Sequence, residues 1–206
     1  MTDRRSLADT PEFAWERQLE KIEEAATAGV DWIQIREKDL SGRMLSEFVQ
    51  EALRRVSGRS AILVNDRLDV ACAVKASGVH LGERSLPVEQ ARRLLGERYA
   101  GKDFLVGVSA HSLKGVLKAE GAGADYVVFG PVYATPSKAE FGQPQGLRRL
   151  RDVCQRITIP VLAIGGVTLE NARDCFASGA AGIAAIRLFQ EAVDLPATVR
   201  ALRGEA

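Results

Sequence analysis

The sequence has no long apolar run. No run approaches the roughly 20 residues that a membrane-spanning helix needs, and Met1 to Ser6 lack the apolar segment of a signal peptide. Charge of one sign is also lacking, since 28 basic residues face 27 acidic ones and the formal net charge is +1. Proteins that bind nucleic acid or membrane surfaces without sequence preference need one-signed patches. We therefore expect a cytoplasmic protein with small-molecule partners, no nucleic-acid or membrane partner, and anion sites that are local.

Cysteine and histidine are scarce. The three cysteines, Cys72, Cys154 and Cys175, are odd in number, widely spaced and set in helix-like patterns, which favours reduced thiols with structural or incidental roles. The two histidines, His80 and His111, follow apolar runs or lie within them. Each is either a proton carrier or a hydrogen-bond partner of loop backbone.

The chain does contain a regular alternation of short apolar runs with amphipathic stretches. Seven runs are apolar on both faces, as in buried parallel strands: 31–36, 61–65, 78–82, 104–109, 125–130, 159–165 and 181–186. Helical patterns lie between them and start near Thr10-Pro11, Ser41, Pro87 and Thr168. With 206 residues and no linker, the sequence predicts one α/β domain over residues 1–206.

Two architectures fit this alternation, a doubly wound open sheet and a (β/α)8 barrel. Polar clusters follow nearly every predicted strand, whereas an open sheet usually concentrates its phosphate chemistry at one glycine-rich turn. The sequence therefore predicts a TIM barrel with its chemistry at the C-terminal ends of the strands. Only Met1 to Arg5 precede Ser6-Leu7 and the first predicted helix, 11–28, so we expect a truncated first strand, either as a stub or because the chain starts upstream.

The most informative run is Gln34-Ile35-Arg36-Glu37-Lys38, where an apolar strand becomes a cluster of charge. The period of two in a strand sends Gln34, Arg36 and Lys38 to one face and Ile35 to the other. An unpaired buried charge is costly, so two converging cations indicate an anion opposite them. Phosphate or diphosphate is the natural candidate.

Other strand ends carry further candidate groups. Asp66, in Asn65-Asp66-Arg67, either forms a structural salt bridge or holds Mg²⁺, which favours one or two carboxylates plus substrate phosphate oxygens. Gly165-Gly166, followed by Arg187 after the last strand, matches the phosphate site that barrels build from their last two loops. The segment 130–138 reads as a long loop that is either simply solvated or offers the hydroxyls of Thr135 and Ser137 and the cation of Lys138.

Taken together, these runs resemble the family of thiamine phosphate synthase and its thiazole tautomerase relatives. The ordered motifs cover nearly the whole chain: Thr2-Asp3-Arg4, Gln34 to Lys38, Asn65-Asp66, Gly78 to Gly82, Gly107-Val108-Ser109, Gly130 to Tyr133 with Thr135, Ser137 and Lys138, and Ile164 to Val167. The resemblance implies the eight-stranded barrel, with Thr2-Asp3-Arg4 at the end of its first strand. Barrels of this kind are compatible with a homodimer.

The resemblance also implies an activity, the coupling of a hydroxymethylpyrimidine diphosphate to a thiazole phosphate with release of diphosphate. It assigns the pyrimidine diphosphate to Gln34, Arg36, Lys38, Asn65, Ser109 and Lys138, with Arg36, Lys38 and Lys138 as the catalytic cations. It assigns Mg²⁺ to Asp66. It assigns the thiazole phosphate to Thr135, Ser137, Gly166, Ile186 and Arg187.

Three departures from the family pattern keep two alternatives open. Ser85 stands where the family usually has a second metal-binding Asp, Arg187 stands where it commonly has Ser, and the first strand is short. A weakened metal site favours a thiazole tautomerase, which needs no diphosphate, although the proton-transferring His of that branch is replaced by Gly130-Pro131. A non-catalytic barrel that binds thiamine precursors is the other alternative.

Overall fold

The computed structural model describes residues 1–7, 10–96, 99, 104–135 and 143–205. Its strands form one sheet in which the order β1 to β7 follows the chain, and the pairs β1–β2, β4–β5, β5–β6 and β6–β7 are parallel. The strands are β1 Trp32–Ile35, β2 Ala61–Asn65, β3 Gly78–Leu81, β4 Leu105–Ala110, β5 Tyr126–Phe129, β6 Val161–Ile164 and β7 Gly182–Ala184. All seven agree with the predicted runs to within two residues at each end. The predicted α/β class is confirmed.

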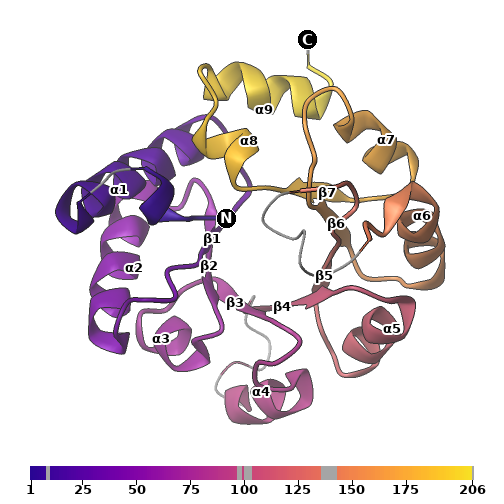
Figure 1. Cartoon of the computed structure of the whole chain (residues 1–206). Helices are drawn as coiled ribbons and strands as arrows, with labels where there is room; N and C mark the ends of the chain where they lie inside the picture. The colour runs from indigo at the N-terminus through magenta and orange to yellow at the C-terminus, as the bar shows by residue number, and fades with distance from the viewer. Residues whose placement is uncertain (8–9, 97–98, 100–103, 136–142, 206) are drawn as a thin grey trace. The chain divides into compact units, whose positions relative to one another are not determined.

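The chain divides into two compact units, and the first comprises Met1–Val79 and Ile186–Ala206. Its helices are η1 Arg4–Ser6 (a 3-10 helix), α1 Pro11–Thr27, α2 Gly42–Val56, α3 Leu68–Ala73, α8 Arg187–Gln190 and α9 Leu195–Arg203. Helices α1 and α2 pack against each other, and α9 packs against α1 (Figure 1). Between α1 and α2, the rings of Trp15 and Phe48 meet edge to face with centroids 4.8 Å apart. Phe48 and Ile62 are fully buried in this core.

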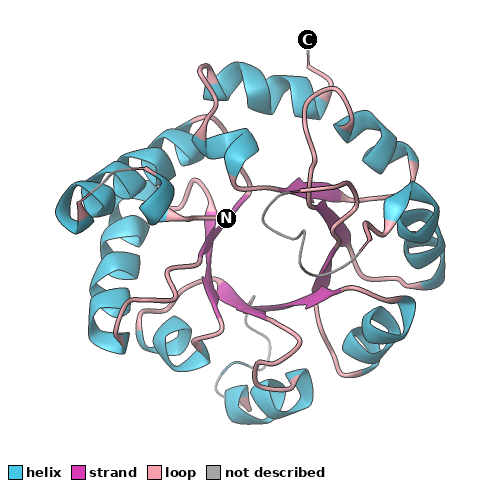
Figure 2. Ribbon diagram, viewed as in Figure 1, coloured by secondary structure: helices cyan, strands magenta, loops and turns pink. Residues whose placement is uncertain are grey.

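The second unit, His80–Ala185, holds β4 to β7 and the helices that precede each of these strands. These helices are α4 Val88–Leu95, α5 Leu113–Gly121, α6 Gly146–Arg156 and α7 Ala172–Ala177. Figure 2 shows this unit as strands with helices along their outer side. Its core contains Tyr126, Phe129 and Leu150, all with at most 1% of their surface exposed. Strand β5 is buried along its whole length, as predicted for a parallel strand with apolar residues on both faces.

The predicted first strand is absent from the described residues that precede α1. Arg4–Ser6 form a 3-10 helix instead, so Asp3 and Arg4 do not continue a strand. Thr2 still donates its backbone N–H to the carbonyl oxygen of Gln34 at 2.9 Å, which places Thr2 alongside β1. Thr2 therefore gives β1 a backbone hydrogen bond without being part of a strand, and the Arg4 side chain bonds to the segment that follows β1.

Helix starts follow the predicted caps in part. Ser41 caps α2, because its hydroxyl accepts a hydrogen bond from Met44 N at 3.3 Å. Thr10 occupies the N-cap position of α1, but its side chain makes no capping hydrogen bond. The start predicted at Thr168 is wrong, since α7 begins at Ala172. Thr168 instead donates its N–H to the side chain of Asn171 at 2.8 Å, in a turn before the helix.

The helices bear on whether the chain could cross a membrane. None in the described residues combines the length and apolar character that crossing a bilayer requires.

Candidate active site

The segment that follows β1 alternates between buried and more exposed side chains. Ile33 and Ile35 are buried, with 5% and 1% of their surface exposed, while Gln34 between them is half-buried. The alternation continues past the strand, because Arg36 is half-buried, Glu37 is buried and Lys38 is exposed. The period of two predicted from the sequence is therefore confirmed, and it separates the two cations from the acid between them.

Arg4 binds the two carboxylates that alternate with these cations. Its Nη1 and Nη2 donate to the two carboxylate oxygens of Asp39 at 2.7 and 2.6 Å, and Nη1 also donates to Glu37 Oε2 at 2.9 Å. Only 6% of the Arg4 surface is exposed. Bidentate pairs of this kind are among the strongest side-chain hydrogen bonds. The hydrogen bonds from Arg4 are the main cause that lowers the pKa of Asp39 to about 2.

Thr2 completes this arrangement from the same N-terminal segment. Its hydroxyl donates to Glu37 Oε1 at 2.5 Å and accepts a hydrogen bond from the backbone N–H of Arg36 at 2.9 Å. The sequence did not predict the contacts of Thr2 and Arg4. The two acids of residues 36–39, Glu37 and Asp39, were a sign only that some cation would pair with them. The nearest signal was the basic residue in Thr2-Asp3-Arg4, more than 30 positions upstream of these acids.

Arg36 and Lys38 are the two cations of this segment, on either side of Glu37. Neither cation forms an ion pair with a carboxylate within the described part of the chain. The neighbouring acids, Glu37 and Asp39, pair with Arg4 instead. Two cations so close in sequence and without a carboxylate partner among the described residues are what the sequence-based prediction of a local anion site requires.

Gln34, Asn65 and Asp66 form a short chain of polar contacts at the ends of β1 and β2. Gln34 Nε2 donates to Asn65 Oδ1 at 3.1 Å, and Asn65 Nδ2 donates to Asp66 Oδ2 at 2.9 Å. Asp66 adopts φ of 61°, in the left-handed region, where the chain turns from β2 toward α3. The Arg67 side chain instead pairs with Asp69, at 2.6 Å. The structure thus brings three predicted residues together and leaves Arg67 out.

A magnesium ion would find few protein ligands among these residues. The described residues contain no group of three or more His, Cys, Asp or Glu side chains that could hold a metal. Ser85, which stands where the family usually has an Asp, accepts a hydrogen bond from Gly82 N at 2.7 Å and so stabilises its own turn. Mg²⁺ is commonly held by one or two carboxylates, with substrate phosphates and water supplying the rest. The single carboxylate of Asp66 fits that sparse donor set.

In the second unit, Ser109 is held by a buried histidine. His80 Nε2 lies 2.8 Å from Ser109 Oγ, and His80 Nδ1 lies 3.1 Å from Tyr126 Oη. Burial raises the pKa of Tyr126, so its phenol stays protonated. A neutral imidazole carries one ring proton and therefore donates to one of these hydroxyls and accepts from the other. His80 thus contacts two side-chain hydroxyls, a role that the sequence did not predict.

Gly107 makes room for this arrangement. A Cβ atom at Gly107 would lie 1.9 Å from Cζ of Tyr126, whose backbone is paired with Gly107 across the β4–β5 ladder. The tyrosine ring therefore crosses the space that a side chain at position 107 would occupy. The signal in the sequence was Gly107 inside an apolar strand, since glycine there often marks a close approach.

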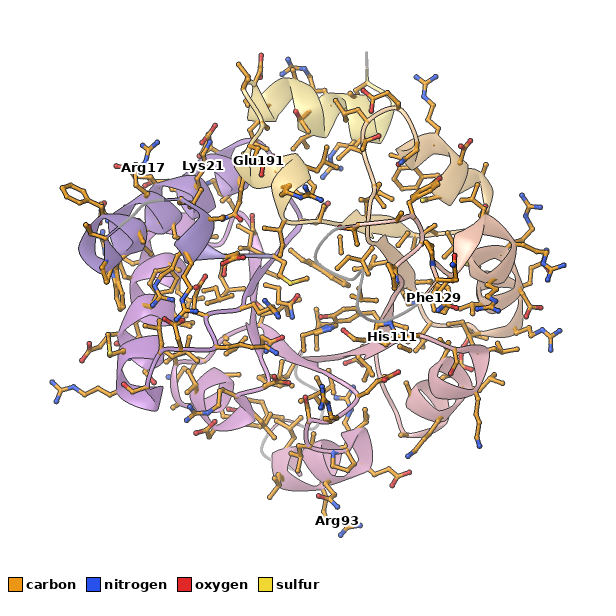
Figure 3. The ribbon with its side chains drawn as sticks, in the orientation of Figure 1. Arg17, Lys21, Arg93, His111, Phe129 and Glu191 are labelled. Atoms are coloured by element: carbon orange, nitrogen blue, oxygen red, sulfur yellow. The ribbon has the colours of Figure 1, made fainter. Side chains whose placement is uncertain are left out.

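His111 serves the loop that follows β5. Its Nδ1 forms a hydrogen bond with the carbonyl oxygen of Gly130, so the predicted contact with loop backbone is confirmed for this histidine. In Figure 3, His111 and Phe129 are labelled at the ends of β4 and β5, where Ala110 and Phe129 are paired in register. His111 therefore links the ends of two neighbouring strands.

The same loop packs on Gly165 and Gly166. Val132 N donates to Ile164 O at 2.8 Å, and Tyr133 N donates to Gly165 O at 2.9 Å. Both glycines have positive φ, and a Cβ at Gly166 would lie 2.5 Å from Ala134 O. Within the described part of the chain, the N–H of Gly166 donates no hydrogen bond. The glycine pair thus permits close packing of the loop and leaves the N–H of Gly166 without an acceptor among the described residues.

The remaining predicted site residues lie in the loop after β5 and at the start of α8. Thr135 is the last described residue of the loop, and Ser137 and Lys138 lie outside the described residues. Ile186 and Arg187 belong to the first unit, where Ile186 is the N-cap residue of α8 and Arg187 begins that helix. Arg187 is exposed.

Of the three cysteines, Cys175 contacts the loop that follows β5, since its Sγ lies 4.0 Å from Tyr133 Oη. Cys175 is buried and Cys72 and Cys154 are half-buried, and all three are free thiols. Burial raises the pKa of Cys154 and of Cys175. A raised pKa keeps a thiol protonated and poorly nucleophilic, which agrees with the structural role expected of these two.

Known proteins resemble this chain over most of its length. The family model described as thiamine monophosphate synthase matches residues 8–189. The thiamine-phosphate synthase of Chloroflexus aurantiacus is 44% identical over 184 residues, which cover 88% of this chain and 82% of that protein. The thiamine-phosphate synthase of Clostridium novyi is 40% identical over 168 residues, covering 81% and 80% respectively.

A solved structure agrees. The thiamine phosphate pyrophosphorylase from Pyrococcus furiosus superposes with a TM-score of 0.82 at 32% sequence identity, covering 98% of this chain and 91% of that one. The sequence motifs, the strand order and these matches lead to one conclusion. The chain belongs to the thiamine monophosphate synthase family.

Proposed function

We propose that this protein is a thiamine-phosphate synthase, which couples hydroxymethylpyrimidine diphosphate to a thiazole phosphate and releases diphosphate. The observation that carries the proposal is the pair of cations at Arg36 and Lys38, which have no carboxylate partner among the described residues. The acids beside them are bound by Arg4, so the pair remains available to an anionic substrate. A diphosphate, with several negative oxygens, matches two adjacent cations better than a neutral ligand does.

The pyrimidine diphosphate is assigned to groups in or just after β1, β2 and β4 and to one loop. These are Gln34, Arg36, Lys38, Asn65, Ser109 and Lys138, the residues that match the family motifs. The contact from Gln34 to Asn65 fixes both amides, and His80 fixes the Ser109 hydroxyl. Groups already held in place lose little conformational freedom when substrate binds. The cations Arg36, Lys38 and Lys138 take the catalytic role.

The chemistry needs charge stabilisation and no protein nucleophile. The bond between the pyrimidine methylene carbon and the diphosphate oxygen breaks, and its electron pair leaves with the diphosphate. The thiazole nitrogen then donates its lone pair to that carbon, which forms the new C–N bond. Negative charge grows on the departing oxygen, so the fixed positive charges of Arg36 and Lys38 stabilise the transition state more than the ground state.

We assign a magnesium ion to Asp66, with substrate phosphate oxygens and water as its other ligands. When bound, the ion adds Lewis-acid stabilisation of the leaving diphosphate. Asn65 donates a hydrogen bond to the Asp66 carboxylate at 2.9 Å and so orients it for this role. With Ser85 in place of a second carboxylate, we expect weak binding of the ion before substrate arrives.

The thiazole phosphate is assigned to Thr135, Ser137, Gly166, Ile186 and Arg187. A backbone N–H, as at Gly166, and a guanidinium, as at Arg187, are each donors of the kind that phosphate oxygens accept. We also propose a cytoplasmic location and small-molecule partners, with a homodimer as a compatible assembly.

Three incubations test the function. The purified protein is given both synthase substrates with Mg²⁺, both substrates with chelator, or the thiazole carboxylate tautomer alone. A synthase forms thiamine phosphate in the first incubation and loses most of that activity with chelator. Conversion of the tautomer without coupling would instead identify the tautomerase. Precursor binding without any product would identify the non-catalytic alternative, and neither result is compatible with the proposal.

A further inference from the structure

Residues 36–39 have a charge pattern that works against anion binding unless something controls it. Arg36, Glu37, Lys38 and Asp39 alternate in sign along four consecutive residues. In a free loop, each carboxylate would compete with a ligand for the neighbouring cations. An anion site built from this segment therefore needs a group that occupies both acids.

Arg4 is that group. It reaches Asp39 through two hydrogen bonds of 2.7 and 2.6 Å and Glu37 through one of 2.9 Å. Side-chain exposure is 7% for Arg4 and 2% for Glu37, so this pair is shielded from water and is screened little by salt. Arg5 also approaches Asp39, at 3.3 Å, but its side chain is 73% exposed. The two neighbouring arginines thus differ in burial and in contact geometry.

Thr2 acts directly on the backbone of the cation segment. Its hydroxyl donates to Glu37 at 2.5 Å and accepts the N–H of Arg36 at 2.9 Å, so one side chain fixes both residues. Thr2 is itself buried, with 2% of its surface exposed, and its N–H is bonded to Gln34 O at 2.9 Å. Thr2 and Arg4 together therefore bond to the first and last residues of the segment 34–39 and to Arg36 and Glu37 between them.

We propose that Thr2 and Arg4 are positioning residues of the diphosphate site, which hold Glu37 and Asp39 so that Arg36 and Lys38 are presented to the anion. The inference rests on the proposed function, because that function identifies the anion as the substrate diphosphate. Neither residue needs to touch substrate. Their effect is on the geometry and availability of the two cations.

Titration calorimetry with inorganic diphosphate in magnesium buffer tests the proposal without requiring turnover. Thr2→Val removes the hydroxyl and keeps the shape, while Thr2→Ser keeps the hydroxyl. Arg4→Lys keeps the charge but loses the bidentate geometry. We expect about tenfold weaker diphosphate binding for Thr2→Val and Arg4→Lys, as for loss of one well-formed charged hydrogen bond. Thr2→Ser and the matched control Arg5→Ala should stay within about twofold of the unchanged protein.

A second titration with the thiazole phosphate separates positioning from general damage. A positioning role leaves this affinity unchanged in Thr2→Val, whereas a merely structural role weakens both ligands in parallel with the thermal midpoint. Parallel losses, unchanged diphosphate binding in Thr2→Val, or no diphosphate binding by the unchanged protein would each overturn the proposal. If the expected pattern appears but no thiamine phosphate is formed, the positioning role stands and the synthase function fails.

Discussion

Gly107 shows how one missing side chain supports the polar group in the second unit. A Cβ at this position would lie 1.9 Å from Tyr126, so Gly107→Ala must displace the buried tyrosine ring. We expect the free energy of unfolding to fall by about 1–3 kcal/mol, as for other overpacked cores. Urea denaturation measures this change. Because Tyr126 contacts His80, the variant should also weaken pyrimidine-diphosphate binding through Ser109.

Gly121 is the matched control. It is the last residue of α5, and a Cβ there would meet nothing within 4 Å. We expect Gly121→Ala to leave stability unchanged or raise it by up to about 0.5 kcal/mol, since alanine favours helix over glycine. If Gly107→Ala were as stable as Gly121→Ala, the described packing of Tyr126 would be wrong.

Sequence reasoning reached some of these residues and missed others. Gln34, Asn65 and Ser109 follow from strand ends and from the family resemblance, but Tyr126 reads as an ordinary member of an apolar strand. Its hydroxyl contact with His80 depends on the register of β4 against β5, which no local pattern specifies. For the same reason, the sequence does not indicate that His80 bonds to the hydroxyls of Tyr126 and Ser109.

At the scale of elements, the tie between η1 and the segment after β1 predicts a dependence of stability on pH. The pKa of Asp39 is lowered from 3.8 to about 2 in the folded protein, mainly by its hydrogen bonds with Arg4. A lowered carboxyl pKa stabilises the fold fully above the unfolded pKa, and this contribution is lost as the pH falls from about 4 to about 2. Because Asp39 is partly exposed, we expect a contribution of the order of 1 kcal/mol.

Asp39→Asn provides the measurement. Urea denaturation of this variant and of the unchanged protein at pH 7, 4 and 2 gives the difference in unfolding free energy at each pH. The difference should be present at pH 7 and near pH 4 and should shrink toward zero at pH 2. A difference that stays constant over this range would show that the Asp39 charge contributes nothing.

The packing of the loop 130–135 on β6 leads to another prediction at this scale. Gly166 has φ of 64°, and a Cβ there would lie 2.5 Å from Ala134 O, so Gly166→Ala must move the loop. We expect the KM for thiazole phosphate to rise about tenfold or more, with a smaller effect on the KM for pyrimidine diphosphate. Steady-state kinetics with each substrate varied in turn provides both values.

Gly29→Ala is the control that distinguishes the effect of backbone strain from the effect of moving the loop. It also has positive φ, of 88°, but a Cβ there would meet nothing within 4 Å. Gly29→Ala should therefore lose some stability, about 1 kcal/mol, with both KM values unchanged. Equal kinetic effects of the two substitutions would contradict the assignment of Gly166 to the thiazole phosphate.

The positions of elements were largely predictable from the sequence. Apolar runs located all seven strands, because buried parallel strands need apolar residues on both faces. The start of α7 was placed four residues early, since Thr168 precedes a turn closed by Asn171. The role of residues 2–4 was not predictable, because Arg4 and Glu37 are 33 positions apart and only the fold brings them together.

At the scale of the whole molecule, the ordered motifs predicted the family, and the comparisons confirm it over residues 8–189. The metal assignment stays a prediction. It rests on Asp66, with Ser85 at the position where the family usually has a second carboxylate.

Ser85→Asp tests that assignment. The substitution restores a carboxylate that resembles the family pattern, and an Asp side chain is also able to accept the hydrogen bond from Gly82 N. We expect the Mg²⁺ concentration that gives half-maximal activity to fall by about tenfold, because a second hard oxygen ligand is added. An Asp66→Asn variant should move it in the opposite direction. If the magnesium dependence were unchanged in both variants, the assignment of the ion to Asp66 would be wrong.

The central claim is that Arg36 and Lys38 form the site for the diphosphate and leave the thiazole phosphate to other residues. Calorimetric titration of Arg36→Ala with each of the two substrates tests it most directly, with the exposed Arg43→Ala as the control. We predict that Arg36→Ala weakens pyrimidine-diphosphate binding by roughly 10- to 100-fold, as for loss of a charged hydrogen bond, and leaves thiazole-phosphate binding within about twofold. Equal losses for the two substrates would contradict the claim.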